Sequence, residues 1–376
     1  MKIWRILTED ILKKLSQSDK IVILYGPRQV GKTTLCRDIL SQSGLKTLYI
    51  NADEARYNDV LTSRNAQKLS NLIAGYELLI IDEAQRIPDI GINLKILFDA
   101  GTGVKIIATG SSSFELANKI SEPLTGRHWT YFLYPIAELE RKHHLNNFEL
   151  ASTLEERLLF GSYPEVFSLA GEERLTYLRT LTSDYLYKDI LALQDIRSPG
   201  KIQDLLKLLA FQIGNQVSLH ELSSQLEMSK ETVARYIDLL EKTFVLFRLS
   251  GFSRNLRKEV TKTYKYYFYD LGVRNSIIDN FKSLTERADV GALWENFLLL
   301  ERQKYTAYNH ISAAPYFWRT YTGSEIDYIE ERDTMLHGYE YKWSERSKRV
   351  PRAWLTTYPG ASYAVITREN YLDFIL

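Results

Sequence analysis

The chain has 376 residues, of which 45% are hydrophobic and 25% are charged, and its formal net charge is +1. This composition is typical of folded globular proteins and excludes a disordered chain. The nearly neutral charge also excludes a surface that is basic or acidic throughout, so any basic surface for nucleic acid must be local.

The length predicts two or three domains, because a domain has roughly 100–200 residues. No apolar run approaches the ~18 residues of a membrane span, and the first residues, MKIWRILTEDILKK, include acids where a signal peptide is apolar. We therefore expect a cytoplasmic protein without a membrane partner.

Four short apolar runs lie in the first third of the chain. They are KIVILY (20–25), KTLYI (46–50), ELLIID (77–82) and VKIIAT (104–109), and the stretches between them are long enough for helices. Such runs are typical of strands buried on both faces, which predicts a parallel sheet with crossover helices. A fifth run, WTYFLY (129–134), precedes Pro135, and we predict that this α/β domain covers residues 1–136.

A phosphate-binding loop is predicted between the first strand and the helix after it. The segment GPRQVGKT matches the pattern G-x-x-x-x-G-K-[ST] in the right structural context. In this pattern the glycines let backbone N–H groups surround a phosphate, Lys32 reaches the outer phosphates, and Thr33 offers its hydroxyl to Mg²⁺. The residues of the loop are Gly26, Pro27, Arg28, Gln29, Val30, Gly31, Lys32 and Thr33, and Arg28 either touches nucleotide or is simply solvated.

An acidic pair ends the third apolar run. Asp82 is placed to hold Mg²⁺ through water, and Glu83 is placed to polarise the attacking water. An acidic pair after a strand is weak evidence by itself. Downstream of a phosphate loop, it predicts a nucleotide-hydrolysing site.

Three hydroxyl residues and one arginine further along the chain are also candidates for the nucleotide-hydrolysing site. Thr109, Ser111 or Ser112, in ATGSSS, can sense the terminal phosphate or orient water, although the same hydroxyls can merely cap the next helix. Arg127, in LTGR, can act as an arginine finger in its own subunit or in a neighbour's, or it is a surface arginine.

The middle of the chain changes its pattern twice. Residues 137–198 have apolar positions three and four apart, as in LEERLLF, which predicts a helical lid. Residues 199–278 then contain a capping box (Ser218 and Glu221), a second helix capped by Ser229, and the strands FVLFRLS and KYYFYD. This order of helix, turn, helix and hairpin predicts a winged helix.

The surfaces of the winged-helix segment differ in charge. On its second helix, Lys230 and Arg235 are offset by three acids, which makes a poor phosphate-binding face. The hairpin loop is richer in basic residues, which are Arg254, Arg257, Lys258, Lys262 and Lys265. With a single acid, Glu259, this loop can make several DNA phosphate contacts, but a solvated hairpin or a protein-contact surface fits equally well.

A Glu-x-Lys strand is predicted near the C-terminus, in HGYEYKWS. Because side chains alternate along a strand, Glu340 and Lys342 share one face. Asp327 lies on the preceding predicted strand and Glu295 on the helix GALWENFLLL. Asp327 and Glu340 can bind Mg²⁺, Lys342 can stabilise charge or position a hydroxide, and Glu295 can complete a metal-dependent nuclease site.

This C-terminal pattern has other interpretations. Paired charges on a hairpin, or a retained fold with a spent site, explain the same residues. A basic cluster follows the strand and can either grip a nucleic-acid backbone or form a solvated loop; it consists of Arg346, Lys348, Arg349 and Arg352.

Together these segments resemble the prokaryotic AAA-superfamily ATPases that carry a C-terminal domain of unknown function 4143. The resemblance covers nearly the whole chain and rests on YGPRQVGKTT, LLIIDEAQRIP, IIATGSSS, LTGR, GSYPEV, YKDI, the winged-helix segment, GALWENF, FWRTYTGSEIDYI and EYKW. It implies that residues Gly26 to Thr34 bind ATP, that Thr33 and Asp82 bind Mg²⁺, and that Glu83 assists hydrolysis.

The C-terminal region resembles the restriction-endonuclease-like superfamily, whose motif positions are matched by Glu295, Asp327, Glu340 and Lys342. The proline that often precedes the aspartate is absent, since Glu325 and Ile326 stand there. The resemblance implies a nuclease-like α/β domain over residues 279–376.

We therefore expect an ATP-hydrolysing AAA-type protein whose nucleotide state controls a DNA-associated, nuclease-like domain. The alternative is an ATP-dependent switch or scaffold, in signalling or defence, with an inactive nuclease-like domain. The expected cofactors are ATP and Mg²⁺, and a homo-oligomer is one way in which Arg127 can act.

Overall fold

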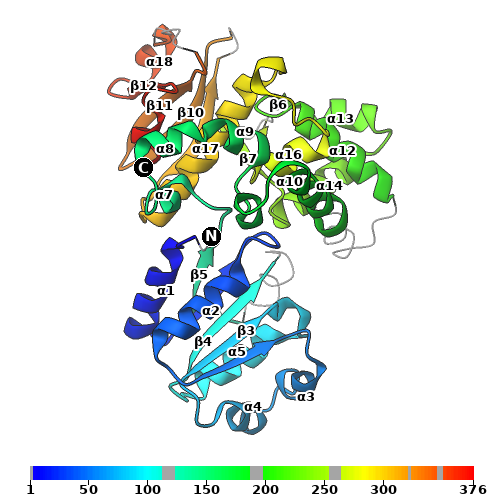
Figure 1. Ribbon diagram of the computed structural model, residues 1–376, viewed down its shortest axis with the longest axis vertical. Helices are drawn as coiled ribbons and strands as arrows, with labels where there is room; N and C mark the ends of the chain where they lie inside the picture. Colours follow the sequence, from blue (N-terminus) through cyan, green and yellow to red (C-terminus); the bar gives the residue numbers. More distant parts are fainter. Residues whose placement is uncertain (1–2, 112–122, 187–197, 254–263, 321–322, 345–349) are drawn as a thin grey trace. The chain divides into compact units, whose positions relative to one another are not determined.

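The computed structural model describes residues 3–111, 123–186, 198–253, 264–320, 323–344 and 350–376 (Figure 1). These residues form two compact units. The N-terminal unit comprises residues 3–135 with 242–244, and the C-terminal unit comprises residues 136–241 and 245–376, within the described ranges.

The N-terminal unit is built on a five-stranded sheet with the order β2-β3-β4-β1-β5. The strands are β1 (Ile21–Tyr25), β2 (Thr47–Asn51), β3 (Leu78–Asp82), β4 (Lys105–Gly110) and β5 (His128–Phe132). All neighbouring strands are parallel. Every residue of β1 and β3 is buried, as expected for strands covered on both faces. The predicted parallel α/β sheet is confirmed.

Helices cover both faces of this sheet (Figure 1). They are α1 (Ile6–Gln17), α2 (Lys32–Ser43), α3 (Asn58–Leu61), α4 (Ala66–Ile73) and α5 (Ile90–Asp99), with 3₁₀ turns at Ala55–Tyr57 and Ala84–Arg86. Apolar side chains of α3, α4 and α5 form one core with Ile21 and Ile23 of β1. The helices α1 and α2 contact each other on the opposite face.

The C-terminal unit begins with short helices. They are α7 (Glu138–Arg141), α8 (Asn147–Ser152), α9 (Leu154–Phe160), a 3₁₀ turn (Pro164–Phe167), α10 (Gly171–Thr180) and a π-helical turn (Leu181–Leu186). The segment that resembles a winged helix follows, with α12 (Pro199–Phe211), β6 (Gln216–Val217), α13 (Leu219–Gln225), α14 (Lys230–Lys242), β7 (Leu246–Gly251) and β8 (Tyr264–Phe268). Ser218 caps α13 as predicted, since its side chain accepts the N–H of Glu221.

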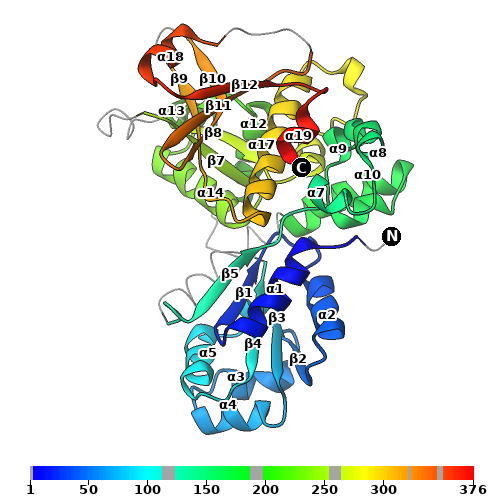
Figure 2. The same ribbon diagram turned by 90° about the vertical axis from the view of Figure 1, so that its left-hand side faces the viewer.

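The remaining elements share a sheet with β7 and β8. They are α16 (Leu271–Ile277), a 3₁₀ turn (Leu284–Glu286), α17 (Val290–Tyr308), β9 (Ala314–Arg319), β10 (Glu325–Arg332), β11 (Met335–Tyr341), α18 (Arg352–Thr357), β12 (Ser362–Ile366) and α19 (Tyr371–Ile375). The seven-stranded sheet has the order β12-β11-β10-β9-β7-β8-β6 and is mixed, and α17 packs against β11 and α19 (Figure 2). Because β7 pairs in parallel with β9, this sheet continues across residue 278. The division into domains at 198 and 278 remains a prediction.

The segment GSYPEV, whose role is not evident from the sequence, forms a buried junction in this unit. Asp270, the N-cap of α16, accepts the N–H groups of Ser162 (2.6 Å) and Val273 (3.0 Å). A Cβ atom at Gly161 would clash with the Asp270 carboxylate, and the φ of +72° at Gly161 also favours glycine. Burial raises the pKa of Asp270 to about 6. One carboxyl group thus joins GSYPEV to α16.

Asp270→Ala should lower the free energy of unfolding of the C-terminal unit by about 2 kcal/mol at pH 5, because two buried N–H groups lose their acceptor. The loss should be smaller at pH 7, because the raised pKa of Asp270 adds stability to the native protein that disappears as the pH rises through about 6. Urea unfolding at both pH values measures this. The control is Arg179→Ala on α10, which breaks an exposed ion pair with Asp279 and should change stability by less than about 1 kcal/mol. Equal losses in the two variants would contradict the role of Asp270.

Candidate functional site

The phosphate-loop residues lie at the carboxyl edge of the parallel sheet. The strand β1 ends at Tyr25 and α2 begins at Lys32, so Gly26–Gly31 forms the connection between them. Gly31 has a φ of +102°, and a Cβ atom at Gly26 would lie 2.5 Å from the carbonyl oxygen of Leu133. Both positions therefore require glycine for a loop of this shape. Arg28 is partly exposed, and Gln29 and Thr34 are exposed.

The Lys32 side chain is folded into this loop. It is 4% exposed, and its Nζ atom donates to the carbonyl oxygens of Gly26 and Pro27, both at 2.9 Å. Arg5, just before α1, donates to the carbonyl oxygen of Val30 at 2.9 Å and so braces the loop from outside. No motif in the sequence pointed to this role of Arg5. An ammonium group enclosed by a glycine-rich loop is suited to a phosphate anion.

Asp82, the last residue of β3, accepts hydrogen bonds from three hydroxyl groups. Thr33 (2.6 Å) and Tyr49 (2.7 Å) donate to Oδ2, and Thr109 (2.5 Å) donates to Oδ1. Burial raises the pKa of Asp82, but these hydrogen bonds and the charge of Lys32 outweigh burial, so the pKa is lowered. Asp82 is therefore an ionised carboxylate next to the Thr33 hydroxyl. Two adjacent hard oxygen ligands of this kind fit Mg²⁺.

Glu83 follows in a left-handed backbone conformation, with a φ of +55°. Its N–H donates to Thr109 Oγ1 at 3.2 Å, so Thr109 contacts both members of the acidic pair. Gln85, which the sequence reasoning missed, donates to Glu83 Oε2 (2.6 Å) and to Ser111 Oγ (3.1 Å). The structure thus brings Glu83, Thr109 and Ser111 together, whereas Ser112 lies outside the described residues.

Arg127 lies at the opposite edge of the sheet. Its carbonyl oxygen accepts the N–H of Ile21, the first residue of β1, and its guanidinium pairs with Asp99 at 2.8 Å. A strand of this length separates the two edges by ~16 Å, which is beyond the reach of an arginine side chain. The predicted role for Arg127 at its own subunit's phosphate loop is therefore wrong, whereas a role in a neighbouring subunit and the alternative of a surface arginine both remain predictions.

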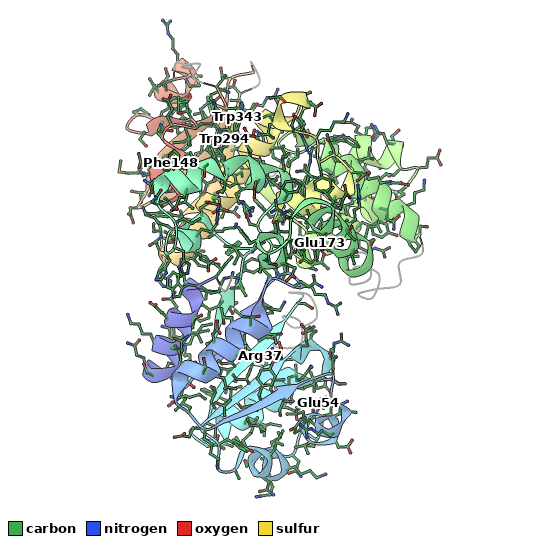
Figure 3. All side chains as sticks on the ribbon, in the orientation of Figure 1. Arg37, Glu54, Phe148, Glu173, Trp294 and Trp343 are labelled. Carbon is green, nitrogen blue, oxygen red and sulfur yellow. The ribbon has the colours of Figure 1, made fainter. Side chains whose placement is uncertain are left out.

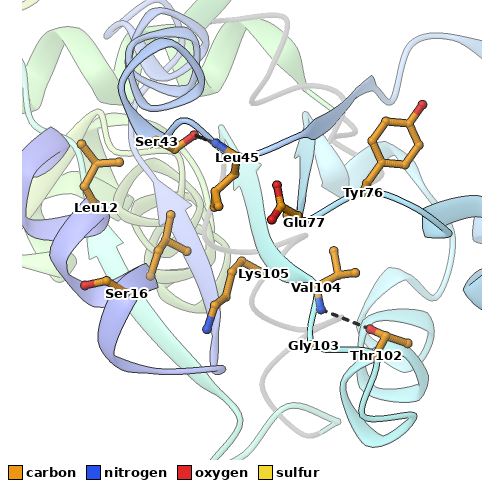
Figure 4. A pocket seen from close by; sticks show the side chains of 11 residues that line it. Leu12, Ser16, Ser43, Leu45, Tyr76, Glu77, Thr102, Gly103, Val104 and Lys105 are labelled. Atoms are coloured by element: carbon orange, nitrogen blue, oxygen red, sulfur yellow. Dashed lines mark hydrogen bonds between the residues drawn. The ribbon is translucent and has the colours of Figure 1, made fainter.

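A pocket of about 450 Å³ also opens at this opposite edge (Figure 4). Its lining includes Leu12, Leu15, Leu45, Tyr76 and Val104. Nucleotides bind parallel sheets at the carboxyl ends of the strands, so this pocket is not the nucleotide site.

In the C-terminal unit, all four predicted nuclease residues lie in one charged cluster. Lys342 Nζ pairs with Glu340 Oε1 at 2.8 Å, and Asp327 Oδ2 accepts the N–H of Tyr341 at 2.8 Å. Trp343 packs edge-on against Trp294 of α17, with ring centroids 5.5 Å apart (Figure 3). This contact fixes the end of the Glu-x-Lys strand against the helix that carries Glu295.

Lys265 corrects a prediction from the sequence. Expected in an exposed basic loop, it lies instead on β8 and is only 3% exposed. Its Nζ pairs with Glu325 Oε1 (2.6 Å) and Glu295 Oε1 (3.1 Å). Burial lowers the pKa of Lys265, but the charges of Glu295, Glu325 and Asp327 outweigh burial and raise it. Lys265 is the first residue of the predicted strand KYYFYD, and because β8 begins one residue earlier, at Tyr264, the lysine lies within the strand and not in the loop.

The other basic residues of the two predicted clusters are mostly beyond the described ranges. Arg352 begins α18 and is exposed. The residues outside the described part are Arg254, Arg257, Lys258, Lys262, Arg346, Lys348 and Arg349, and so is the segment YKDI.

The carboxylates of the C-terminal cluster do not fit the predicted three-ligand metal site. Burial, followed by the charges of Glu295 and Glu340, raises the pKa of Asp327 to about 7. Glu295 Oε1 accepts both Lys265 and the hydroxyl of Tyr267. Within the described ranges, no three His, Cys, Asp or Glu side chains are arranged to hold one metal ion. The assignment of Glu295, Asp327 and Glu340 as metal ligands remains a prediction.

Three family models match parts of the chain. An AAA domain matches residues 18–141, a domain of unknown function (DUF8612) matches 151–284, and another (DUF4143) matches 290–370. In the portion that the structure describes, no helix has the length and apolarity needed to cross a membrane.

The chain is similar in sequence to two uncharacterized proteins. The uncharacterized protein Rv2008c of Mycobacterium tuberculosis is 29% identical over 337 residues, covering 88% of this chain and 72% of the relative. The uncharacterized protein MJ1637 of Methanocaldococcus jannaschii is 29% identical over 334 residues, covering 76% of this chain and 70% of the relative.

Among solved structures, the Walker-type ATPase PABY2304 of Pyrococcus abyssi has a similar fold. Its TM-score is 0.50 at 16% sequence identity, and the match covers 74% of this chain and 96% of that one. Residues 18–141 thus match an AAA domain model, the N-terminal unit has the fold of a P-loop ATPase, and residues 290–370 match the DUF4143 model.

Proposed function

We propose that the N-terminal unit binds and hydrolyses ATP with Mg²⁺, and that its nucleotide state controls a DNA-associated, nuclease-like C-terminal unit. The observation that carries the ATPase assignment is the Asp82 carboxylate. It lies at hydrogen-bond distance from Thr33 of the phosphate loop helix and is linked through Thr109 to Glu83.

The proposed mechanism uses groups that are already in place. Backbone N–H groups of Gly26–Gly31 surround the phosphates, and Lys32 exchanges the carbonyl oxygens of Gly26 and Pro27 for outer phosphate oxygens. Thr33, directly, and Asp82, through water, would hold Mg²⁺, which would supply positive charge to the transferring phosphoryl group. Glu83 orients and polarises the attacking water, while Thr109 and Gln85 hold Glu83 in position.

Lys32→Ala should abolish ATP binding, because the loop loses the charge that contacts the outer phosphates. Glu83→Gln should bind ATP but hydrolyse it about 10²-fold more slowly or worse, because a general base contributes at least that factor. Equilibrium ATP binding and phosphate release measure the two effects. Glu77→Gln is a matched control, because Glu77 directly precedes β3 and lies at the opposite end of this strand from Asp82 and Glu83. This variant should hydrolyse ATP normally. Wild-type hydrolysis in the Lys32→Ala variant would exclude the assignment.

A second candidate function is a switch or scaffold whose nuclease-like domain is inactive. The observation that favours it is the pairing of Glu295 and Glu325 with Lys265 and of Glu340 with Lys342. In this alternative the C-terminal unit binds DNA or a protein without cutting DNA.

DNA cleavage separates the two candidates. In the first, the wild-type protein cuts single- or double-stranded DNA with Mg²⁺ or Mn²⁺ in an ATP-dependent manner, and the Asp327→Ala, Lys342→Ala double variant does not. Gel assays of both proteins, with and without ATP, measure this. Intact DNA in every sample would leave the switch or scaffold as the function, and equal cleavage by the double variant would place the activity elsewhere.

A further inference from the structure

Six charged side chains meet at the sheet of the C-terminal unit, and the carboxylates outnumber the ammonium groups. The carboxylates come from Glu295 on α17, Glu325 and Asp327 on β10, and Glu340 on β11, and the ammonium groups are those of Lys265 and Lys342. Such an excess of negative charge in a partly buried place is unfavourable unless a carboxylate is protonated or a cation lies close to it.

Lys265 already provides that cation for two of the carboxylates. Its Nζ lies 2.6 Å from Glu325 Oε1 and 3.1 Å from Glu295 Oε1, and the side chain is almost completely buried. The ammonium also lies 5.5 Å from the centre of the Phe317 ring, which favours a positive charge there. It is a permanent part of the core of this unit and not a mobile surface charge.

Glu295 is also held away from a shared metal position. Its Oε1 atom accepts the Tyr267 hydroxyl in addition to Lys265. Its Oε2 atom faces Gly214, where an added Cβ would lie 3.4 Å from that oxygen. Both oxygens of Glu295 therefore point toward β8 and the turn before β6.

We propose that Lys265 is a built-in counter-cation that takes the place of a divalent ion at Glu295 and Glu325 and keeps the affinity of this cluster for divalent cations low. This inference rests on the proposed function, in which the C-terminal unit is nuclease-like. It identifies a residue that sets the affinity of that unit's charged cluster for divalent cations. Lys265 acts through the carboxylates and is a positioning residue. A divalent ion that approached them would be repelled by an ammonium only a few ångströms away.

The test is Mn²⁺ binding to the full-length chain without nucleotide, measured by electron paramagnetic resonance. All proteins carry Asp82→Asn, so that the N-terminal unit contributes no metal site. Lys265→Gln, which keeps hydrogen-bond donors near both carboxylates but removes the charge, should bind Mn²⁺ at least about tenfold more tightly than its parent, because one repulsive charge is gone. Adding Glu295→Gln to that variant should cancel the gain.

Arg319→Gln is the matched control. Arg319 lies 3.9 Å from the same Glu325 carboxylate, but its side chain is 44% exposed, so solvent screens its charge. This control should leave Mn²⁺ affinity within about twofold of the parent. A gain as large as that of Lys265→Gln would show a general charge effect and overturn the specific role of Lys265.

Two further outcomes would also overturn the proposal. One is an unchanged or weaker Mn²⁺ affinity in a folded Lys265→Gln variant, with folding checked by circular dichroism. The other is tight, saturable binding of one Mn²⁺ per chain by the Asp82→Asn parent, which still contains Lys265. The measured quantity is Mn²⁺ affinity, so a protein that cuts no DNA can still give the result expected for Lys265. Failure of the nuclease proposal is therefore distinguishable from failure of the proposal for Lys265.

Discussion

The N-terminal unit depends most on the hydrogen bonds that the Asp82 carboxylate accepts. One buried side chain joins α2 through Thr33, β2 through Tyr49 and β4 through Thr109. Burying a charge is costly unless it is hydrogen-bonded, and here three hydroxyl donors and the charge of Lys32 outweigh that cost and keep the group ionised. The same contacts place an anion, a hydroxyl and an ammonium within one loop region, which is the combination that a metal-bound triphosphate requires.

The C-terminal unit uses buried charge for a different purpose. Asp270 ties GSYPEV to α16, and Lys265 ties β8 to α17 and β10. The chain enters this unit at Ile136, whose N–H donates to the carbonyl oxygen of Ser162 and whose own carbonyl oxygen accepts Lys304 Nζ. Since Ser162 belongs to GSYPEV, the motif anchors the residue at which the chain enters the C-terminal unit.

The sequence predicts local chemistry well and long-range partners poorly. The phosphate loop, Asp82 and Glu83 could be located because their spacing follows from one strand and one turn. Tyr49 and Arg5 could not be located in this way. The role of Tyr49 depends on β2 lying beside β3, and the role of Arg5 depends on how α1 packs against the phosphate loop. Lys265 was misplaced because a lysine beside a basic loop looks solvated until its strand is known to pair inside a larger sheet. For Arg127 the sequence left three alternatives open, and the parallel pairing of β5 with β1 places this residue at the amino edge of the sheet, away from its own phosphate loop.

The most direct test of the central claim, that nucleotide state controls the C-terminal unit, is the DNA affinity of the Glu83→Gln protein with ATP, with ADP and without nucleotide. Fluorescence anisotropy with labelled single- and double-stranded DNA measures it. The account predicts that the ATP-bound and ADP-bound states differ in DNA affinity by about fivefold or more, which is the range of ordinary coupling between two sites. Equal affinities in the three states, or no binding in any of them, would contradict it.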